Sequence, residues 1–359
     1  MSYVLAFAGF ALLIILHEAG HFAAAKAVGM RVERFALFFP PLLFKVRRGE
    51  TEYGVGAIPL GGYVRISGMN PLEEIPPEHA HRAYFRQPVW KRIVVIAAGP
   101  FVNVVIAFVL LTALFAFKGN PETLNRVAPI ALEPPALGDL KVGDQLLSVD
   151  GRKATPTNVR DALSRHACKD RPPVDGCNGA SAATLRIKRD GQLRTLHIVP
   201  RYDGTLKRMR LGFTFDFGFV DKSLPQAAGL AVGGMWRVSR ETVKAIARIF
   251  YSSKARKDVS GVVGSYEVTR ESFNFDFAQA INVLAIVSLS LAVINLFPFL
   301  PLDGGHIFWA LAEKVRGRPI AFSVIERASA IGFILVIMLF VIGLSNDIGR
   351  LRGEGFGLR

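Results

Sequence analysis

Long apolar stretches alternate with polar segments along this chain of 359 residues. A helix needs roughly 20 apolar residues to cross the hydrocarbon core of a bilayer, and four stretches are close to that length. They cover residues 3–28, 93–117, 277–297 and 325–344. The pattern predicts a polytopic α-helical membrane protein with about four transmembrane helices.

The polar segments between these stretches predict two parts with β structure. Residues 40–69 alternate in hydrophobicity and contain Gly61-Gly62, which favours a membrane-associated β-hairpin on the cytoplasmic side. An ordinary cytosolic connector is the alternative. Residues 118–200 combine strand signals, an Asp150-Gly151 turn and helical periodicity at 158–166, which is typical of a small α+β domain.

The next polar segment, residues 201–276, is predicted to be a connector. Within it, residues 234–250 carry both large apolar and basic side chains at helical spacing, which favours a helix lying along the membrane surface. A helix packed inside the protein is the alternative. The expected domain organisation is therefore 1–117 with two transmembrane helices and the hairpin, 118–200, the connector 201–276, and 277–359 with the last two transmembrane helices.

Composition and charge refine this organisation. The protein is 51% hydrophobic and has a formal charge of +15, but its basic residues are scattered, which favours a membrane protein over a nucleic-acid-binding one. The positive-inside rule places the basic loops 29–92 and 312–322 in the cytoplasm and the long 118–276 segment outside. The only cysteines, Cys168 and Cys177, fall in that outer segment, where they form a disulfide or stay free.

A metal-binding motif lies inside the first apolar stretch, in the sequence His17-Glu18-Ala19-Gly20-His21. On a helix this spacing puts both imidazoles on one face, as two zinc ligands require, with the glutamate beside them as a base. Ionisable side chains are costly in a membrane span and mark functional sites. The motif predicts a zinc-dependent hydrolase whose active site lies within the bilayer.

A catalytic zinc takes three protein ligands and keeps one position for water. The best candidate for the third ligand is Asp303, at the end of the third apolar stretch. Pro298, Gly304 and Gly305 break the helical pattern around it, and broken backbone at membrane depth is tolerated only where it is buried or lines a cavity. An aspartate that caps the following helix is the alternative.

Three motifs follow one another in order along the sequence. They are the HExxH run, Gly99-Pro-Phe-Val-Asn103 in the second stretch, and Asn295-x-x-Pro followed by Leu-Asp-Gly-Gly in the third. With these motifs the sequence resembles the site-2 proteases, which are intramembrane zinc metalloproteases, and most of all the bacterial RseP type. It departs from that pattern at Pro301, which stands one place late, and at Val262, where a proline is usual.

The resemblance implies Zn²⁺ as cofactor and cleavage of single-span membrane proteins in regulated intramembrane proteolysis. Anti-sigma factors and remnant signal peptides are the implied substrate classes. It also implies a multi-pass protein of the bacterial inner membrane, with its active site near the cytoplasmic side and a PDZ domain outside. The run at 142–151 nearly matches a PDZ signature. A peptide or the C-terminus of another protein is then a candidate ligand, and a spacer or size filter is the alternative.

Roles follow from the chemistry and the resemblance together. His17, His21 and Asp303 are expected to hold zinc, and Glu18 to accept the proton of the attacking water. The resemblance makes Asn295 a candidate oxyanion donor or substrate clamp, with a helix–helix hydrogen bond as the alternative. Structural roles near the site are expected for Gly99, Asn103, Pro298, Gly304 and Gly305.

Two other functions fit parts of the sequence. A metal transporter would use the same imidazoles and carboxylate as transit ligands, and an inactive scaffold would keep only the PDZ-like domain. The glutamate beside the two imidazoles favours the protease. A helical substrate must unwind before it is cut, and we expect the hairpin at 50–66 to hold the unwound segment as an added strand.

Overall fold

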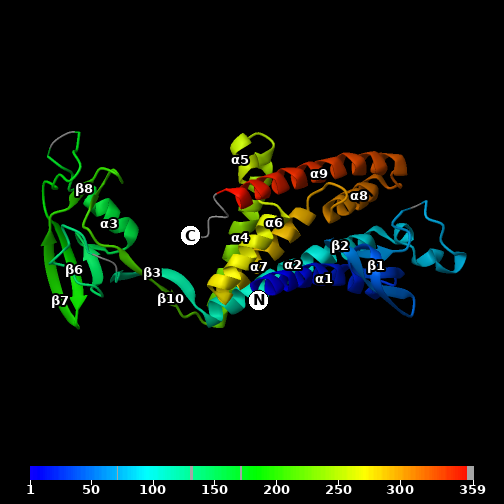
Figure 1. The fold of residues 1–359 in the computed structure, drawn as a ribbon, viewed down its shortest axis with the longest axis horizontal. Coiled ribbons are helices and arrows are strands. Elements are labelled where there is room, and N and C mark those ends of the chain that lie inside the picture. The colour runs from blue at the N-terminus through cyan, green and yellow to red at the C-terminus, as the bar shows by residue number, and fades with distance from the viewer. Residues whose placement is uncertain (71, 130–131, 170–171, 354–359) are drawn as a thin grey trace. The chain divides into compact units, whose positions relative to one another are not determined.

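A computed structural model describes residues 1–70, 72–129, 132–169 and 172–353 (Figure 1). The protein divides into two compact units, one formed by Met1–Lys118 with Lys222–Arg359 and the other by Gly119–Asp221. The first unit consists of helices and one β-hairpin. The second is mostly β structure.

The described residues include four helices long and apolar enough to cross a membrane. They match the four predicted stretches, although the second begins earlier and the fourth is longer at both ends. These helices are α1 (Ser2–Ala27), α2 (Val89–Phe117), α7 (Phe277–Asn295) and α9 (Phe322–Arg352).

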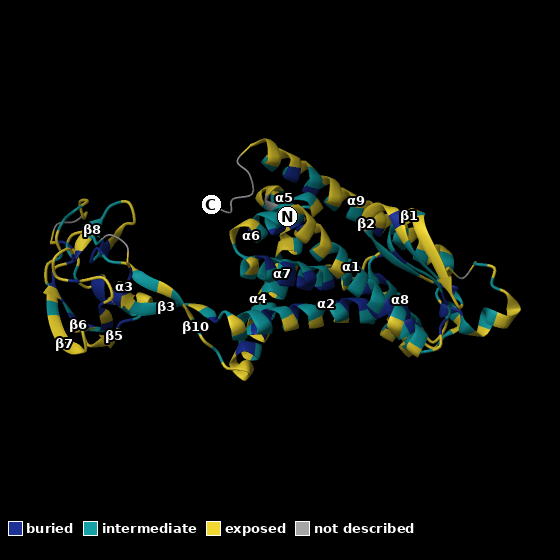
Figure 2. Cartoon of the chain, turned by 60° about the horizontal axis from the view of Figure 1, so that its bottom comes forward, coloured by how far each residue is buried: buried dark blue, intermediate teal, exposed yellow. Residues whose placement is uncertain are grey.

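The outer faces of these helices are apolar. In α9 only 11% of the most apolar window is buried inside the protein, and Figure 2 shows exposed positions along its length. Large side chains such as Ile331, Phe333 and Ile334 are more than half exposed. An apolar surface of this extent is typical of contact with lipid.

Helix α2 is the central element of the helical unit. It packs against α1, α7, α4 (Leu224–Ile249) and α8 (Asp303–Arg316). The short helix α5 (Ser253–Asp258) packs against α4 and α9, and α6 (Val262–Phe275) packs against α1, α7 and α9.

Helix α4 contains the expected helix at 234–250 and extends it toward the N-terminus. It starts at Leu224, where Ser223 and Gln226 form a reciprocal capping box. Its Ala231 is fully buried in a cluster with Leu111 of α2 and Ala285 of α7. The added N-terminal part therefore packs inside the unit, while much of 234–250 stays exposed, as expected for a surface helix.

The hairpin consists of two long antiparallel strands, β1 (Val32–Arg48) and β2 (Thr51–Ile66), and so begins before residue 40. Each strand is bent. Phe35 pairs with Val64 on one side and with Tyr53 on the other, and Tyr53 also pairs with Val46. The hairpin therefore forms four arms in the order 62–66, 32–37, 51–58 and 42–48. Prolines interrupt both strands near the bends, since proline cannot donate to a ladder.

An ion-pair cluster fixes the turn of the hairpin. Glu50 accepts hydrogen bonds from Arg82 at 2.6 and 2.9 Å and from Lys26 at the end of α1 at 2.5 Å. The bonds from Arg82, followed by those from Lys26, outweigh burial and lower the pKa of Glu50 to about 2. The carboxylate therefore stays ionised at neutral pH and ties the turn to α1 and to the 3-10 helix at Pro77–Arg82. A second 3-10 turn, Tyr84–Arg86, leads into α2.

The second unit is built around one sheet of antiparallel strands that differ in length. Its path is β10 (Phe215–Val220), β3 (Asn120–Val127), β4 (Gln145–Val149), β6 (Ala183–Arg189) and β7 (Gln192–Ile198), with β5 (Arg152–Lys153) beside β4. Helix α3 (Pro156–Leu163) contributes Val159, Ala162 and Leu163 to the core. Two short strands, β8 (Arg201–Asp203) and β9 (Arg208–Arg210), form a separate hairpin.

The boundary of this unit differs from the predicted 118–200. The unit continues to Asp221 because β10 returns to pair with β3, and such a long-range pairing has no local sequence signal. The expected connector therefore starts after residue 221. Cys168 and Cys177 form a disulfide in this unit, which agrees with the paired alternative.

The contact between α1 and α2 depends on small residues. A Cβ added at Gly20 would lie 2.6 Å from the carbonyl oxygen of Ala98 on α2 and 2.9 Å from Cγ2 of Val102. Neither a backbone carbonyl nor a buried helix can move without cost in a close-packed interior. Glycine at this position therefore sets the distance between the two helices.

We expect Gly20→Ala to destabilise the protein by about 1–3 kcal/mol, because the added methyl group overpacks this contact. Gly229→Ala is the matched control, since Gly229 lies in α4 with open space around the position of a Cβ. That substitution should be neutral or stabilise by up to about 1 kcal/mol. Thermal unfolding in detergent compares the two. Equal midpoints for both variants would contradict the role of Gly20.

Candidate metal centre and active site

Two imidazoles and one carboxylate converge in the helical unit. His17 and His21 are buried on one face of α1, with their Nε2 atoms 3.4 Å apart. Asp303, the first residue of α8, places Oδ2 at 3.4 Å from each of these nitrogens. Two ligands that sit about 2.0–2.1 Å from a tetrahedral zinc lie about 3.3–3.4 Å from each other. The three atoms therefore have the spacing of a zinc ligand set.

The carboxylate supports the same interpretation. Asp303 Oδ2 is buried and has no hydrogen-bond partner among the described residues. A buried carboxylate oxygen without a partner is costly, and a bound metal ion would remove that cost. Among the described residues, His17, His21 and Asp303 form the one group of at least three potential metal-ligand side chains that lie this close together.

A tight turn before α8 directs Asp303 toward the histidines. A Cβ added at Gly304 would lie 2.2 Å from the carbonyl oxygen of Leu296, and one added at Gly305 would lie 2.5 Å from the amide nitrogen of Leu300. Only glycine lets the backbone fold this closely onto the segment that contains Pro298. The helix-breaking residues therefore shape the turn that brings the carboxylate to α1.

Helix α2 orients His21. The Nδ1 atom of His21 lies 2.9 Å from the carbonyl oxygen of Val95, which can only accept a hydrogen bond. The proton of a neutral imidazole is therefore on Nδ1, and Nε2 keeps its lone pair for a metal. A Cβ added at Gly99 would lie 2.2 Å from His21 Nε2, so glycine makes room for the ring itself.

Asn103 of α2 contacts the other imidazole. Its side-chain amide lies 3.2 Å from His17 Nδ1, and its backbone carbonyl accepts a hydrogen bond from Ser288 of α7. The amide oxygen is buried without a partner among the described residues. Turning the amide over would let this oxygen accept the Nδ1–H of His17, and the amide orientation is assigned from such networks. His17 Nε2 would then be free for a metal, as in His21.

Glu18 lies between α1 and the β-hairpin. Its Cγ atom is 2.7 Å from the position that a Cβ on Gly62 would occupy. The face of the 62–66 arm therefore covers the acidic side chain next to the two imidazoles, and Gly62 provides the space. Asn295 is the last residue of α7 and is partly buried. Its side chain makes no hydrogen bond with another described residue.

Sequence reasoning missed two features of this site. The Val95 carbonyl carries no side-chain signal, because any residue supplies one. Gly62 was expected only as an interruption in a hairpin, and its place against Glu18 depends on tertiary packing. Asn103 was expected to be structural, and the structure places it against His17 as well as against α7.

Comparison with known proteins agrees with this geometry. A family model described as Peptidase family M50 matches residues 5–339. The chain belongs to peptidase family M50. The resemblance to the site-2 proteases is thereby confirmed.

Relatives of similar length carry matching names. A Rhizobium meliloti protein named "Putative zinc metalloprotease R01501" is 30% identical over 368 residues, which cover 95% of each protein. A Clostridium acetobutylicum protein with the same kind of name is 30% identical over 356 residues, with 96% of each protein covered. Zinc metalloprotease Rip1 of Mycobacterium tuberculosis is 29% identical over 372 residues, covering 88% of this protein and 87% of its own length.

This M50 peptidase is therefore a zinc metalloprotease and a multi-pass membrane protein. The residues present fit the metal, because three ligand atoms have tetrahedral spacing and one buried oxygen lacks another partner.

Replacement of Asn103 should weaken metal binding. We expect Asn103→Leu to lower zinc affinity by about 10–100-fold, because the leucine leaves His17 Nδ1 without a partner that orients the ring. Thr112→Val is the control on the same helix, since the Thr112 hydroxyl is buried without a partner among the described residues and its loss should leave zinc affinity unchanged. Competition for Zn²⁺ with a fluorescent chelator measures both affinities. Wild-type affinity in Asn103→Leu would exclude the orienting role.

Proposed function

We propose that this M50 peptidase is an intramembrane endopeptidase that cleaves single-span membrane proteins. Its zinc is held by His17, His21 and Asp303, and Glu18 is the catalytic base. The observation that carries the proposal is the set of three ligand atoms 3.4 Å apart on helices that are apolar enough to lie in a bilayer. Such polar groups in a membrane span are expected to be functional.

The protein's own residues would perform most of the reaction. Zinc supplies Lewis-acid activation of water and of the scissile carbonyl when it is bound. Glu18, next in sequence to His17, is placed to accept a proton from the attacking water and to pass it to the leaving amine. Asn295, at the end of the helix that precedes the Asp303 turn, is proposed to donate to the oxyanion or to hold the substrate backbone.

The hairpin is proposed to hold the substrate in an extended form. The 62–66 arm is paired on one side with 32–37, and no other described strand pairs with its outer edge. The face of this arm lies against Glu18 at Gly62, so a strand added at the free edge would run next to the acidic side chain. By contrast, the 51–58 arm is paired on both sides and cannot accept another strand. We infer that an unwound substrate segment adds to the 62–66 edge.

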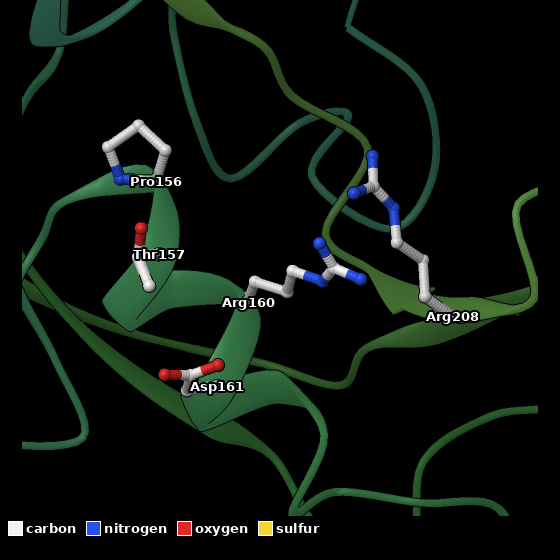
Figure 3. A pocket seen from close by; sticks show the side chains of 5 residues that line it. All are labelled: Pro156, Thr157, Arg160, Asp161 and Arg208. Atoms are coloured by element: carbon white, nitrogen blue, oxygen red, sulfur yellow. The ribbon is translucent and has the colours of Figure 1, made fainter. Parts of the chain in front are cut away.

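The second unit is proposed to be a PDZ-like domain that binds a peptide or the C-terminus of another protein, with a spacer role as the alternative. A groove runs between α3 and β9, and Figure 3 shows Arg160 and Arg208 reaching into it from its two sides. Neither arginine forms an ion pair with a described acidic residue. Asp161 also lines the groove, and the two arginines outnumber it, so the groove is suited to an extended peptide with a carboxylate.

We further propose a place for the protein in the cell. The basic loops 29–92 and 312–322 support an inner-membrane protein with the 118–276 segment outside and the metal centre near the cytoplasmic side. Anti-sigma-factor-like proteins or remnant signal peptides, cut first outside, are the proposed substrates in regulated intramembrane proteolysis.

Glu18→Gln separates proteolysis from metal binding. We expect zinc affinity to stay near that of the wild type, while cleavage of a single-span substrate in vesicles falls by about 10²–10⁴-fold with the loss of the base. His21→Ala is the comparison variant and should lose both zinc and cleavage. A zinc transporter would show no cleavage in the wild type. Full activity of Glu18→Gln would exclude Glu18 as the base.

Proline substitution tests the strand edge. Adjacent N–H groups in a strand point to opposite edges, so of Tyr63→Pro and Val64→Pro only one removes a donor from the free edge. That variant should cleave about tenfold more slowly, which corresponds to one lost backbone hydrogen bond to the substrate. Phe44→Pro, on the 42–48 arm, is the control and should cleave at the wild-type rate. Unchanged cleavage in both edge variants would argue against strand addition.

A further inference from the structure

A partly buried ion pair joins α2 to the helix that carries Asp303. Arg92, in the first turn of α2, donates from Nη1 and Nη2 to the two carboxylate oxygens of Glu313, at 2.9 and 2.6 Å. The side chain of Arg92 is 10% exposed and that of Glu313 is 25% exposed. Glu313 lies in α8, ten residues after Asp303. Neither residue belongs to a motif that pointed to the metal centre.

The two helices run in opposite directions beside one another. Asp303 lies at the histidines that α2 orients through Val95 and Asn103, and Glu313 lies at Arg92, near the start of α2. Between these ends, Ile307 of α8 packs on the cluster that contains Val95 and Ile96. Helix α2 is also the element against which α8 packs most extensively. The contact between α2 and α8 therefore helps to decide where Asp303 lies, together with the Gly304-Gly305 turn.

The geometry of the pair suits it to fix the register of α8. Two parallel bonds between a guanidinium and a carboxylate form at one relative orientation of the groups. A shift of α8 by a single residue would move Glu313 by about 1.5 Å along the axis and rotate it by about 100°. Such a shift would break both bonds and carry Asp303 away from the two imidazoles.

Stability alone does not account for this pair. A buried ion pair often adds little stability compared with apolar side chains of similar size, and here the Nε of Arg92 is also buried without a partner among the described residues. Tyr84 lies beside the pair, and burial raises the pKa of its hydroxyl, so the ring is neutral and balances neither charge. Apolar side chains would fill the same space at lower cost but would not fix an orientation.

We propose that Arg92 and Glu313 are positioning residues for the metal centre: their ion pair sets the register of α8 on α2 and so holds the Asp303 carboxylate at the distance that zinc requires. The inference rests on the proposed ligand set of His17, His21 and Asp303. It assigns no contact with zinc or substrate to either residue of the pair.

The decisive variant replaces both charges with apolar side chains, Arg92→Met with Glu313→Leu. We expect the thermal unfolding midpoint of the full-length protein in detergent to stay within a few degrees of the wild type, because the cavity remains filled. Zinc affinity, measured by competition with a fluorescent chelator, should fall by about tenfold or more, as for other residues that orient metal ligands. Cleavage of a single-span substrate should fall with it.

A conservative variant and a matched control complete the design. Arg92→Lys keeps the charge but cannot form two parallel bonds with the carboxylate. This variant should fold like the wild type but bind zinc more weakly. In the second unit, Arg189 binds Asp144 through two bonds of 2.7 and 2.6 Å, with side chains that are 11% and 1% exposed. Arg189→Met with Asp144→Leu removes a similar pair and should leave zinc affinity unchanged.

The outcomes separate this inference from the proposed ligand set. Zinc affinity at the wild-type level in both Arg92→Lys and the apolar double variant would overturn the positioning role. Asp303→Ala is measured alongside and should lose zinc. If Asp303→Ala lost zinc while the pair variants kept it, only the positioning role would fail. If Asp303→Ala kept zinc, the ligand set would fail, and the positioning role with it.

Discussion

The close contact between α1 and α2 is the constraint on which the site depends. Gly20 lets α1 lie directly on the backbone of α2, and Gly99 lets α2 lie directly under the ring of His21. At this distance the carbonyl of Val95 and the amide of Asn103 reach the imidazoles of α1. A larger side chain at either glycine would separate the helices and remove both contacts. The two histidines proposed as metal ligands are therefore oriented by a neighbouring helix rather than by their own.

The same helix also positions Asp303, the proposed third ligand. Helix α8 lies along α2, and the Arg92–Glu313 pair and the Gly304-Gly305 turn hold its two ends. In an apolar environment each buried polar group needs a partner. Asp303 Oδ2 and Asn103 Oδ1 are buried atoms near the site that have none in the part of the protein that the structure describes. Asp303 Oδ2 lies where a metal would need a free ligand atom, and Asn103 Oδ1 lies where His17 would need an acceptor that orients its ring.

The bends in the hairpin have a consequence for substrate binding. Two unbroken strands would give a simple ribbon, but the bends turn the pair into a four-arm sheet with the 62–66 arm at one edge. That arm lies against Glu18. An exposed edge is a liability in most proteins because it pairs with other polypeptides. Beside a proteolytic centre, an exposed edge would bind an unwound substrate segment as an added strand.

The sequence by itself determined the features that depend on local patterns. Apolar length predicted the four membrane helices, the i, i+4 spacing placed His17 and His21 on one face, and helix-breaking residues around Asp303 marked it as the candidate third ligand. The motifs in their order also identified the family. Only the tertiary structure decided the partners of these residues: the Val95 carbonyl, Gly62 against Glu18, the edge position of the 62–66 arm, and β10 beside β3. Those contacts join positions far apart in the sequence and use backbone atoms or glycines, which carry no chemical signal until the protein has folded.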